Sequence, residues 1–204
     1  MTSPNFLIIG AQKGGTTWLA RILTKHPDVF MPAREIEFFS KPETMAKGLD
    51  WYEENFKNVL QESAIGEKSP SYIWVNQQSL HEVHRHIHEY SPDIKLIAVL
   101  RDPVQRAISH ARHYMRGARI GGKVSPLASL DHLILNSSLS KGILSRGHYA
   151  EQLEAYYQYF KPEQILTIIN EEEIVKDPKA VMARVCNFLE VDASFDFKDA
   201  DKTV

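Results

Sequence analysis

The chain has 204 residues and a mass of 23.3 kDa, the size of one domain with a hydrophobic core of its own. Hydrophobic residues make up 43% and charged residues 25%, as in an ordinary globular protein, and the formal net charge is -2. This charge argues against a general nucleic-acid-binding protein, which carries a basic surface, but it leaves room for a local basic cleft. The single cysteine excludes an internal disulfide framework.

The chain shows no signal that would direct it into or through a membrane. The start lacks a basic segment followed by an apolar run. No stretch approaches the ~20 consecutive apolar residues that cross a bilayer. We therefore expect a cytoplasmic protein without a membrane span. Cys186 lies in the amphipathic pattern VMARVCNFL, which predicts a buried core thiol.

Taken in chain order, strand-like and helix-like segments alternate. Apolar runs predict strands at 5–10, 28–32, 94–100 and 164–170, and a strand end followed by a loop at 64–70. Helical patterns are found at 16–24, 49–56, 77–90, 103–116, 147–160 and 177–189, with Asp102 and Pro103 as an N-cap and first turn. The glycine-rich stretch 117–126 is expected to be a flexible loop, either plain or acting as a lid over an acceptor.

Strands separated by helices predict an α/β fold, a single domain with a central, mostly parallel sheet flanked by helices. Ligands of such sheets bind beyond the carboxyl ends of the strands. The residues that follow strand ends are therefore the first place to look for a site.

The loop after the first strand reads GAQKGGTTW and has the character of an anion-binding loop. Gly14 and Gly15 allow backbone N–H groups to approach an anion, and the helix from Thr16 adds its positive end. Lys13 adds a full charge, and Thr16 and Thr17 add hydroxyl donors. A tight turn without a ligand would not need this combination. The loop departs from G-x-x-x-x-G-K-[ST], because Thr16 stands where a triphosphate-binding loop has lysine.

A second anion site is predicted in LRDPVQRAISHARHY, directly after the strand at 94–100. Arg101 follows the strand, and Ser109 lies on the second turn of the next helix with Arg106 one turn before it. An arginine fork and a hydroxyl suit a phosphate. The alternative is that Arg101 pairs with Asp102 or with a sheet neighbour. Two anion sites on one sheet edge indicate a ligand with two separated anionic groups, which ATP does not have.

Two further segments carry candidate catalytic groups. In PAREIEFFS, Glu35 and Glu37 fall on the same side if the segment is extended, and a carboxylate anchored by Phe38 and Phe39 suits a general base. In IGEKSPSYIW, Lys68 follows a strand end, where it could flank one anionic centre together with Lys13. Taken alone, each of these side chains fits an ordinary surface residue better than a catalytic one.

Together these blocks resemble the sulfotransferases that use 3'-phosphoadenosine 5'-phosphosulfate (PAPS). The chain is most similar to the heparan sulfate glucosaminyl N- and 3-O-sulfotransferase branch and its bacterial relatives. The resemblance rests on IIGAQKGGTTWL, HPDVFMPAREIEFFS, GEKSPSYIW and LIAVLRDPVQRAISHARHYM, with a weaker block in LSRGHYAEQLEAYYQYF. It implies a P-loop-like sulfotransferase fold and transfer of a sulfuryl group to a hydroxyl or amine, carbohydrates included.

The resemblance also implies roles for single residues. The cofactor-binding residues would be Lys13, Gly14, Gly15, Thr16, Thr17 and Trp18 at the 5'-phosphosulfate, and Arg101 and Ser109 at the 3'-phosphate. Glu35 would be the catalytic base of an in-line displacement. Lys68 and Lys13 would stabilise charge on the leaving nucleotide, 3'-phosphoadenosine 5'-phosphate (PAP), without a metal. Acceptor-side residues are implied only weakly; they are Glu37, Ser71, Arg146 and Tyr149.

The chain departs from the family pattern at two places. Glycan-acting relatives often have E-x-H-F-F, whereas Glu37 stands at the histidine position here, which predicts a more acidic acceptor pocket and a neutral or amine-bearing acceptor. The family's C-terminal cofactor loop, rich in glycine and basic residues, has no counterpart before Val204. We therefore expect residues 1–204 to form one sulfotransferase domain that lacks this loop, through truncation or disorder.

Other interpretations stay open. The chain could be a P-loop ATPase or small-molecule kinase, although no strand ends in the aspartate that such enzymes use, or a binding module without activity. His81, His84 and His88 share a helix face, which fits a metal site or, more simply, a solvated face. The aromatic run Tyr156, Tyr157, Tyr159 and Phe160 predicts core packing, with substrate stacking as the alternative. The acceptor and the oligomeric state cannot be inferred.

Overall fold

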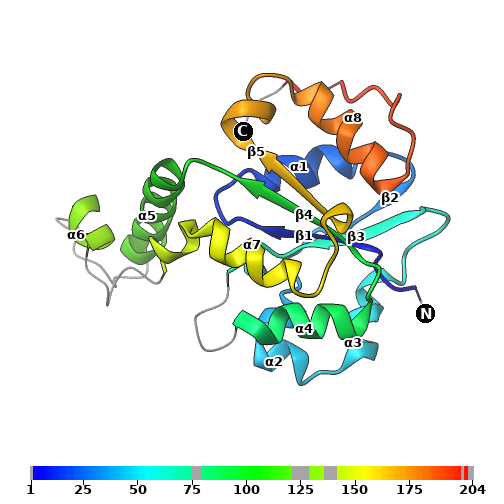
Figure 1. The fold of residues 1–204 in the computed structure, drawn as a ribbon, viewed down its shortest axis with the longest axis horizontal. Coiled ribbons are helices and arrows are strands. Elements are labelled where there is room, and N and C mark those ends of the chain that lie inside the picture. Colours follow the sequence, from blue (N-terminus) through cyan, green and yellow to red (C-terminus); the bar gives the residue numbers. More distant parts are fainter. Residues whose placement is uncertain (1, 75–79, 121–128, 136–141, 199, 202–204) are drawn as a thin grey trace.

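The molecule is built on one parallel sheet. The computed structural model describes residues 2–74, 80–120, 129–135, 142–198 and 200–201. The five strands lie in the order β2-β3-β1-β4-β5, and every neighbouring pair is parallel (Figure 1). Their bounds are β1 (Phe6–Gly10), β2 (Val29–Phe30), β3 (Ala64–Lys68), β4 (Lys95–Leu100) and β5 (Ile165–Ile169). The predicted α/β fold with a central parallel sheet is confirmed.

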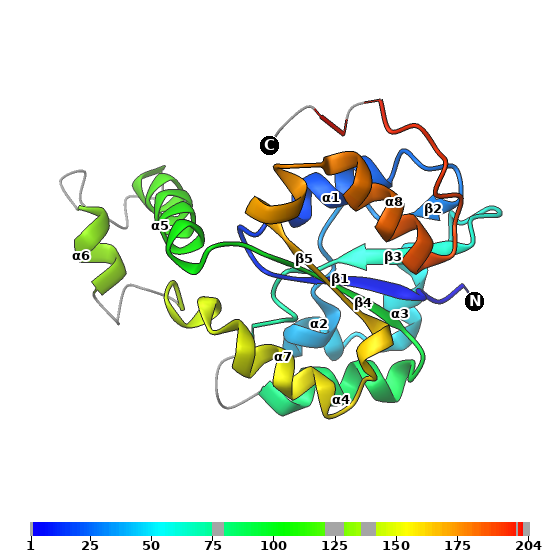
Figure 2. The same cartoon turned by 45° about the horizontal axis from the view of Figure 1, so that its top comes forward.

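Helices cover both faces of the sheet, as Figure 2 shows. On one face lie α1 (Thr16–Leu23) and α8 (Pro178–Leu189); on the other lie α3 (Leu49–Glu53), α4 (Leu80–Tyr90) and α7 (Tyr149–Tyr157). The alternation of β1 explains this division, because successive side chains of a strand point to opposite faces. Phe6 and Ile8 pack in the core under α1 and α8, while Leu7 and Ile9 pack in the core on the other side.

One long helix extends away from the sheet. α5 (Pro103–Ile120) starts directly after β4, and α6 (Leu130–Leu135) packs beside it (Figure 1). The start of α5 is fixed by the predicted N-cap, because the backbone N–H of Gln105 donates to Asp102 Oδ1 at 2.8 Å. The first turn of α5 is therefore fixed at the carboxyl end of β4, where a ligand of this fold binds.

The structure differs from the predicted elements at several places. Residues 117–120 continue α5 rather than starting a loop, and the rest of the predicted loop, 121–126, lies outside the described residues, as does the predicted helix start at 77–79. The helix predicted from 147 begins at Tyr149, after a 3-10 turn. The short helices α2 (Pro42–Met45) and α6 were not predicted.

The segment around the candidate base is not extended. Glu37 has a left-handed backbone with φ of 54°, and a 3-10 turn, Phe38–Ser40, follows it. The expectation that Glu35 and Glu37 share one side of an extended segment is therefore wrong, because the backbone turns between them. Phe38 and Phe39 are buried against Tyr52, as the anchoring role requires.

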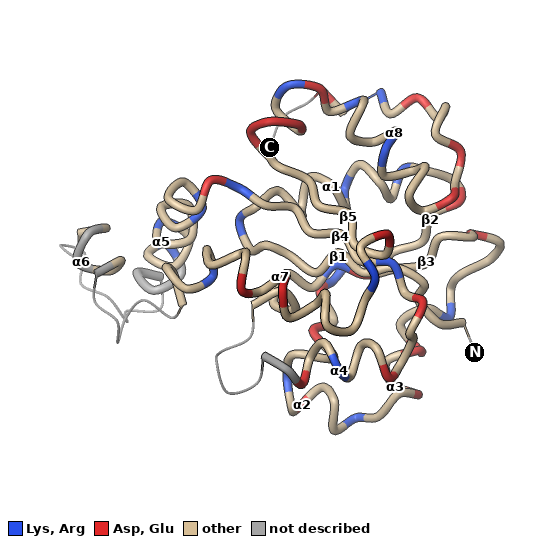
Figure 3. The backbone as a smooth tube through the Cα atoms, viewed as in Figure 1, with Lys and Arg blue, Asp and Glu red and all other residues tan. Residues whose placement is uncertain are grey.

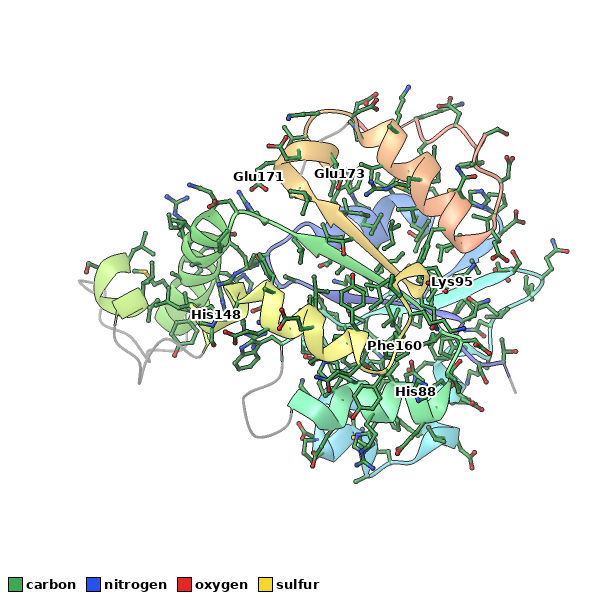
Figure 4. The ribbon with its side chains drawn as sticks, in the orientation of Figure 1. His88, Lys95, His148, Phe160, Glu171 and Glu173 are labelled. Carbon is green, nitrogen blue, oxygen red and sulfur yellow. The ribbon has the colours of Figure 1, made fainter. Side chains whose placement is uncertain are left out.

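His84 of α4 belongs to the core rather than to a solvated face, and His88 is half-buried. The His84 ring is buried, with its centroid 3.9 Å from that of Tyr156, and His88 lies beside Phe160 with centroids 5.6 Å apart (Figure 4). The side chain of His81 lies outside the described residues. Among the described residues, no group of three metal-ligating side chains is close enough to hold a metal ion. The predicted core packing is confirmed for Tyr156 and Phe160 and in part for Tyr159, which is half-buried. It is wrong for Tyr157, which is 45% exposed because it lies on the outer side of α7.

Cys186 is fully buried in the core beside α1, as predicted, and burial raises the pKa of its thiol to about 11. In the part of the chain that the structure describes, none of the helices combines the length and apolarity needed to cross a bilayer. The cytoplasmic location stays a prediction.

Candidate active site

A cavity of about 440 Å³ lies where β1, β4 and β5 end. Its walls come from three strand ends: the β1–α1 loop, the residues after β4 with the first turns of α5, and the turn after β5. The lining residues are Lys13, Gly15, Thr16, Thr17, Trp18, Arg101, Ser109, Asn170, Ile174 and Val175. Seven of the eight residues that the sequence assigns to the cofactor therefore line one cavity, and Gly14 is the exception.

The β1–α1 loop is held tightly against the sheet. The backbone N–H of Ala11 donates to the Val99 carbonyl at 2.7 Å, and that of Gly14 donates to the Ala11 carbonyl at 2.9 Å. A Cβ on Gly14 would lie 2.2 Å from the Val99 oxygen, so only glycine allows this approach. Gly14 thus serves the packing of the loop on β4, and its N–H does not face an anion as predicted.

The N-terminus of α1 is open toward the cavity. Gly15 stands at the cap position with φ of 121°, and no side chain caps the first turn. The first N–H groups of a helix have no partner within the helix, and with the helix dipole they favour an anion. Trp18 lines the cavity, but its indole is only 2% exposed and donates Nε1–H to the Ala200 carbonyl at 3.3 Å. Its ring therefore belongs to the core.

Arg101 and Ser109 lie on the other side of the cavity, as predicted. Arg101 Nε lies 3.4 Å from Oε1 of Glu171, a residue of the π-helical turn Asn170–Ile174 after β5 (Figure 4). Glu171 Oε2 also accepts the backbone N–H of Asp102 at 3.2 Å. The alternative that Arg101 pairs with a sheet neighbour is thus realised, although Arg101 itself lines the cavity.

Arg106 does not join this site. Its side chain is fully buried, and Nη2 donates to the Ile143 carbonyl. Burial lowers the pKa of the guanidinium. Positions three apart on a helix are close, yet here Ser109 reaches the cavity and Arg106 turns into the molecule. The predicted arginine fork therefore consists of Arg101 alone.

The two catalytic candidates form an ion pair at the edge of the cavity. Lys68 Nζ lies 2.6 Å from Glu35 Oε1 and 3.5 Å from the hydroxyl of Thr17, which lines the cavity. Lys13 belongs to the same group: burial lowers the pKa of its ammonium, Arg116 and Lys68 lower it further, and the Glu35 carboxylate opposes this change. One carboxylate and two ammonium groups thus lie beside the open end of α1.

The acceptor-side candidates do not gather in the described cavity. The Glu37 carboxylate pairs with Lys41, which raises the pKa of that ammonium. Ser71 shares a hydrogen bond of 2.8 Å with Ser40, and Tyr149 donates its hydroxyl to the Arg101 carbonyl at 2.9 Å. The Arg146 guanidinium lies 3.8 Å from the ring centroid of Trp74. Burial and the nearby Arg106 lower the Arg146 pKa to about 10.

Sequence reasoning missed two polar residues, one in the wall of the cavity and one buried beside Lys68. Asn170 follows β5 directly, lines the cavity, and donates from Nδ2 to the Gly14 carbonyl at 2.8 Å. The same rule that pointed to residues after the first and fourth strands would have found it. Glu67 is fully buried next to Lys68 and accepts hydrogen bonds from four donors. Nothing in the local sequence distinguishes it from an exposed glutamate.

Charged residues are interspersed along the chain, and the acidic turn after β5 faces the start of α5 across the cavity end of the sheet (Figure 3). An all-parallel sheet, an open helix N-terminus after β1 and basic residues at neighbouring strand ends define a P-loop-like α/β protein. The sulfotransferase domain model matches residues 3–203, and the chain belongs to this family.

Relatives agree with this assignment. Human heparan sulfate glucosamine 3-O-sulfotransferase 6 is 35% identical over 191 residues, which cover 91% of this chain and 52% of that protein. Mouse heparan sulfate glucosamine 3-O-sulfotransferase 3A1 is 34% identical over 193 residues, covering 91% and 45%. The chain thus spans about half the length of these relatives.

Solved structures share the fold. A sulfotransferase from Alicyclobacillus acidocaldarius superposes with a TM-score of 0.83 at 30% identity, covering 97% of this chain and 85% of that one. Mouse sulfotransferase SULT7A1, solved in complex with PAP, superposes with a TM-score of 0.61 at 16% identity, covering 99% and 62%. The second likeness concerns the fold alone.

Proposed function

We propose that this chain transfers the sulfuryl group of PAPS to a hydroxyl or amine acceptor and releases PAP. One observation carries the proposal: a single cavity joins the open N-terminus of α1 to Arg101 and Ser109, and the Glu35–Lys68 ion pair lies at its edge. Family membership and relatives named as sulfotransferases support the same activity.

The residues present fit this nucleotide. Its 5'-phosphosulfate would be held by Lys13 and by the uncapped N–H groups at the start of α1, which suit an anion without a metal ion. Its 3'-phosphate would be held by Arg101 and Ser109, which line the same cavity. When bound, the nucleotide supplies an activated sulfuryl group; the chain supplies position and charge.

The reaction would then follow from the side chains at the cavity edge. Glu35 takes the proton of the attacking hydroxyl or amine, and the new bond to sulfur forms as the bond to the bridging oxygen breaks. Lys68 and Lys13 stabilise the negative charge that develops on that oxygen. Transfer between fixed groups of this kind depends mainly on positioning and charge stabilisation.

The acceptor class is inferred from the relatives and from the charges near Glu35. The relatives named above act on heparan sulfate glucosamine. Glu37 adds a carboxylate near the base, although Lys41 compensates its charge. We therefore propose a hydroxyl- or amine-bearing acceptor, carbohydrates included, with less negative charge than heparan sulfate.

Nucleotide binding gives the first test. In calorimetry, PAP should bind at least about tenfold more tightly than 5'-AMP, because a charge-assisted contact to a phosphate contributes roughly 1.5–3 kcal/mol. ATP should bind no better than 5'-AMP, with or without magnesium. Magnesium-dependent ATP binding that exceeds PAP binding would instead favour the ATPase or kinase interpretation.

Transfer gives the second test. Wild-type protein is incubated with sulfur-35-labelled PAPS and glucosamine, a desulfated heparan oligosaccharide or 4-nitrophenol. Glu35→Gln should lower transfer by about 10²–10⁴-fold and leave PAP affinity within about twofold. Glu43→Gln, an exposed carboxylate on α2, is the matched control and should keep the wild-type rate. Unchanged turnover of Glu35→Gln would assign the base elsewhere.

A further inference from the structure

Glu67 is a fully buried carboxylate beside the catalytic candidates. It precedes Lys68 at the end of β3, and its side chain has no exposure to solvent. Oε1 accepts the hydroxyls of Tyr72 at 2.6 Å and Tyr52 at 3.2 Å. Oε2 accepts the Ser69 hydroxyl at 2.7 Å and the backbone N–H of Ile36 at 3.4 Å. A buried carboxylate is stable only when its oxygens are satisfied in this way.

These bonds connect the two segments that carry the ion pair. The Ile36 N–H and the Glu37 N–H follow Glu35 directly; the first donates to Glu67 and the second to Ser69 Oγ at 2.9 Å. Ser69 in turn donates to Glu67. One buried carboxylate thus fixes the backbone on which Glu35 sits and the strand end that carries Lys68.

The chemistry of the four partners explains why an acid stands here. All four are donors toward Glu67, and an ionised carboxylate is an acceptor only. No lysine, arginine or histidine of the described residues forms an ion pair with Glu67. Burial raises its pKa, while the hydrogen bonds from Tyr72 and Ser69 oppose that change. The carboxylate is therefore devoted to hydrogen bonding rather than to neutralising a cation.

We propose that Glu67 and Ser69 are positioning residues that hold Glu35 against Lys68 in the geometry for sulfuryl transfer. Residues 35–37 are not part of a strand, and Glu37 has a left-handed backbone, so strand pairing does not stabilise the segment after Glu35. Its direction is instead fixed by the two N–H bonds. The proposal rests on the proposed function, since it assigns how the base of that reaction is held.

The test compares Ser69→Ala and Glu67→Gln with Tyr52→Phe. Ser69→Ala removes the acceptor of the Glu37 N–H; Glu67→Gln keeps size but replaces one accepting oxygen by a donor. Tyr52→Phe removes one donor to Glu67 and leaves both bonds to the base segment, so it is the matched control. With PAPS and the best acceptor of the panel above, the first two variants should lower kcat about tenfold or more. PAP affinity should stay within about twofold, and Tyr52→Phe should keep kcat.

A double-mutant cycle separates positioning from general damage. If Ser69 acts through Glu35, adding Ser69→Ala to Glu35→Gln should leave the residual rate unchanged. Equal fold losses in both backgrounds, or wild-type kcat in both single variants, would overturn the proposal. If the wild-type protein binds PAP but transfers the sulfuryl group to none of the acceptors, the proposed function is wrong, and this result is distinct from a failure of the positioning proposal. Circular dichroism and PAP binding identify a variant that does not fold. Because Glu67→Gln and Ser69→Ala test the proposal independently, one of them can still decide it if the other does not fold.

Discussion

His110 is a neutral histidine enclosed by cations. It lies on α5 with 7% of its surface exposed, and burial together with Arg146, Arg106 and Lys13 lowers its pKa to about 3. His113, one turn further, adds to this effect. Among the described residues, no carboxylate raises the pKa of His110 and offsets the repulsion that a proton there would meet.

His110 should therefore make the fold sensitive to acid. Its folded-state pKa is lower than the ordinary value of 6.5, so the unfolded chain binds the proton first as pH falls, and stability is lost from about pH 6.5 downward. Between pH 7 and pH 5 the proton uptake of this histidine in the unfolded chain should lower the free energy of unfolding by about 2 kcal/mol. Urea unfolding at both pH values should show a smaller loss for His110→Gln than for the wild type.

His148→Gln serves as the control, because this histidine lies on the surface with 60% of its side chain exposed. It should keep the wild-type dependence on pH. Equal losses in the wild type and in His110→Gln would mean that His110 keeps an ordinary affinity for protons in the fold.

Single residues differ in how far the sequence revealed them. Lys13, Arg101 and Ser109 follow strand ends, and the topology brings such positions together whatever the details of packing. Glu67 depends on hydroxyls and an N–H from three separate segments, so its burial could not be predicted from its neighbours. The prediction that residues 35–37 are extended was wrong for the same reason, because hydrogen bonds to Glu67 and Ser69, which lie far away in the sequence, fix that backbone.

At the scale of elements, the β1–α1 loop and the sheet form one unit. Ala11 bonds to Val99 of β4, Gly14 packs on the same carbonyl, and Asn170 after β5 bonds to the Gly14 carbonyl. The loop is therefore fixed by two neighbouring strands in addition to its own. The strands could be predicted because they are apolar runs; α2 and α6 could not, because four and six residues are too few to show a helical period.

Gly14→Ala should distort this unit. Its Cβ would meet the Val99 oxygen at 2.2 Å, and a backbone atom cannot move aside. We expect a loss of about 3 kcal/mol in unfolding free energy and at least about tenfold weaker PAP binding. Gly48→Ala is the control: φ is 82°, but no atom lies within 4 Å of the added Cβ. Gly48→Ala should lower the free energy of unfolding by about 1 kcal/mol without changing PAP affinity. Wild-type PAP affinity in Gly14→Ala would show that the loop can shift freely.

At the scale of the whole molecule, the segment after α8 completes the core under α1. His26 Nε2 lies 2.9 Å from the Asp192 carbonyl, and Trp18 bonds to Ala200. Phe195 and Phe197 pack edge to face at 4.9 Å, and Phe197 is 5% exposed. Residues of α1 and of the segment after α8 thus belong to one hydrophobic cluster, although they are far apart in the sequence.

Phe197→Ala should accordingly destabilise the entire fold. Removing a buried phenylalanine costs about 3–5 kcal/mol, and the transition in urea should move as one cooperative step. Leu60→Ala, at a leucine that is 88% exposed, should change stability by less than about 0.5 kcal/mol. A small loss for Phe197→Ala would show that the segment opens without unfolding the rest.

The Arg101–Glu171 pair changes what an affinity measured at this cavity means. The Arg101 guanidinium already has an anionic neighbour, Glu171, on the next strand end, so an anion that binds Arg101 as proposed would compete with this carboxylate rather than fill a bare site. The observed affinity is then the difference between two charge-assisted contacts, each of which salt weakens. Sulfate and phosphate buffers would enter the same competition. Measured constants for such a site are comparable only when the buffer anion and the ionic strength are the same.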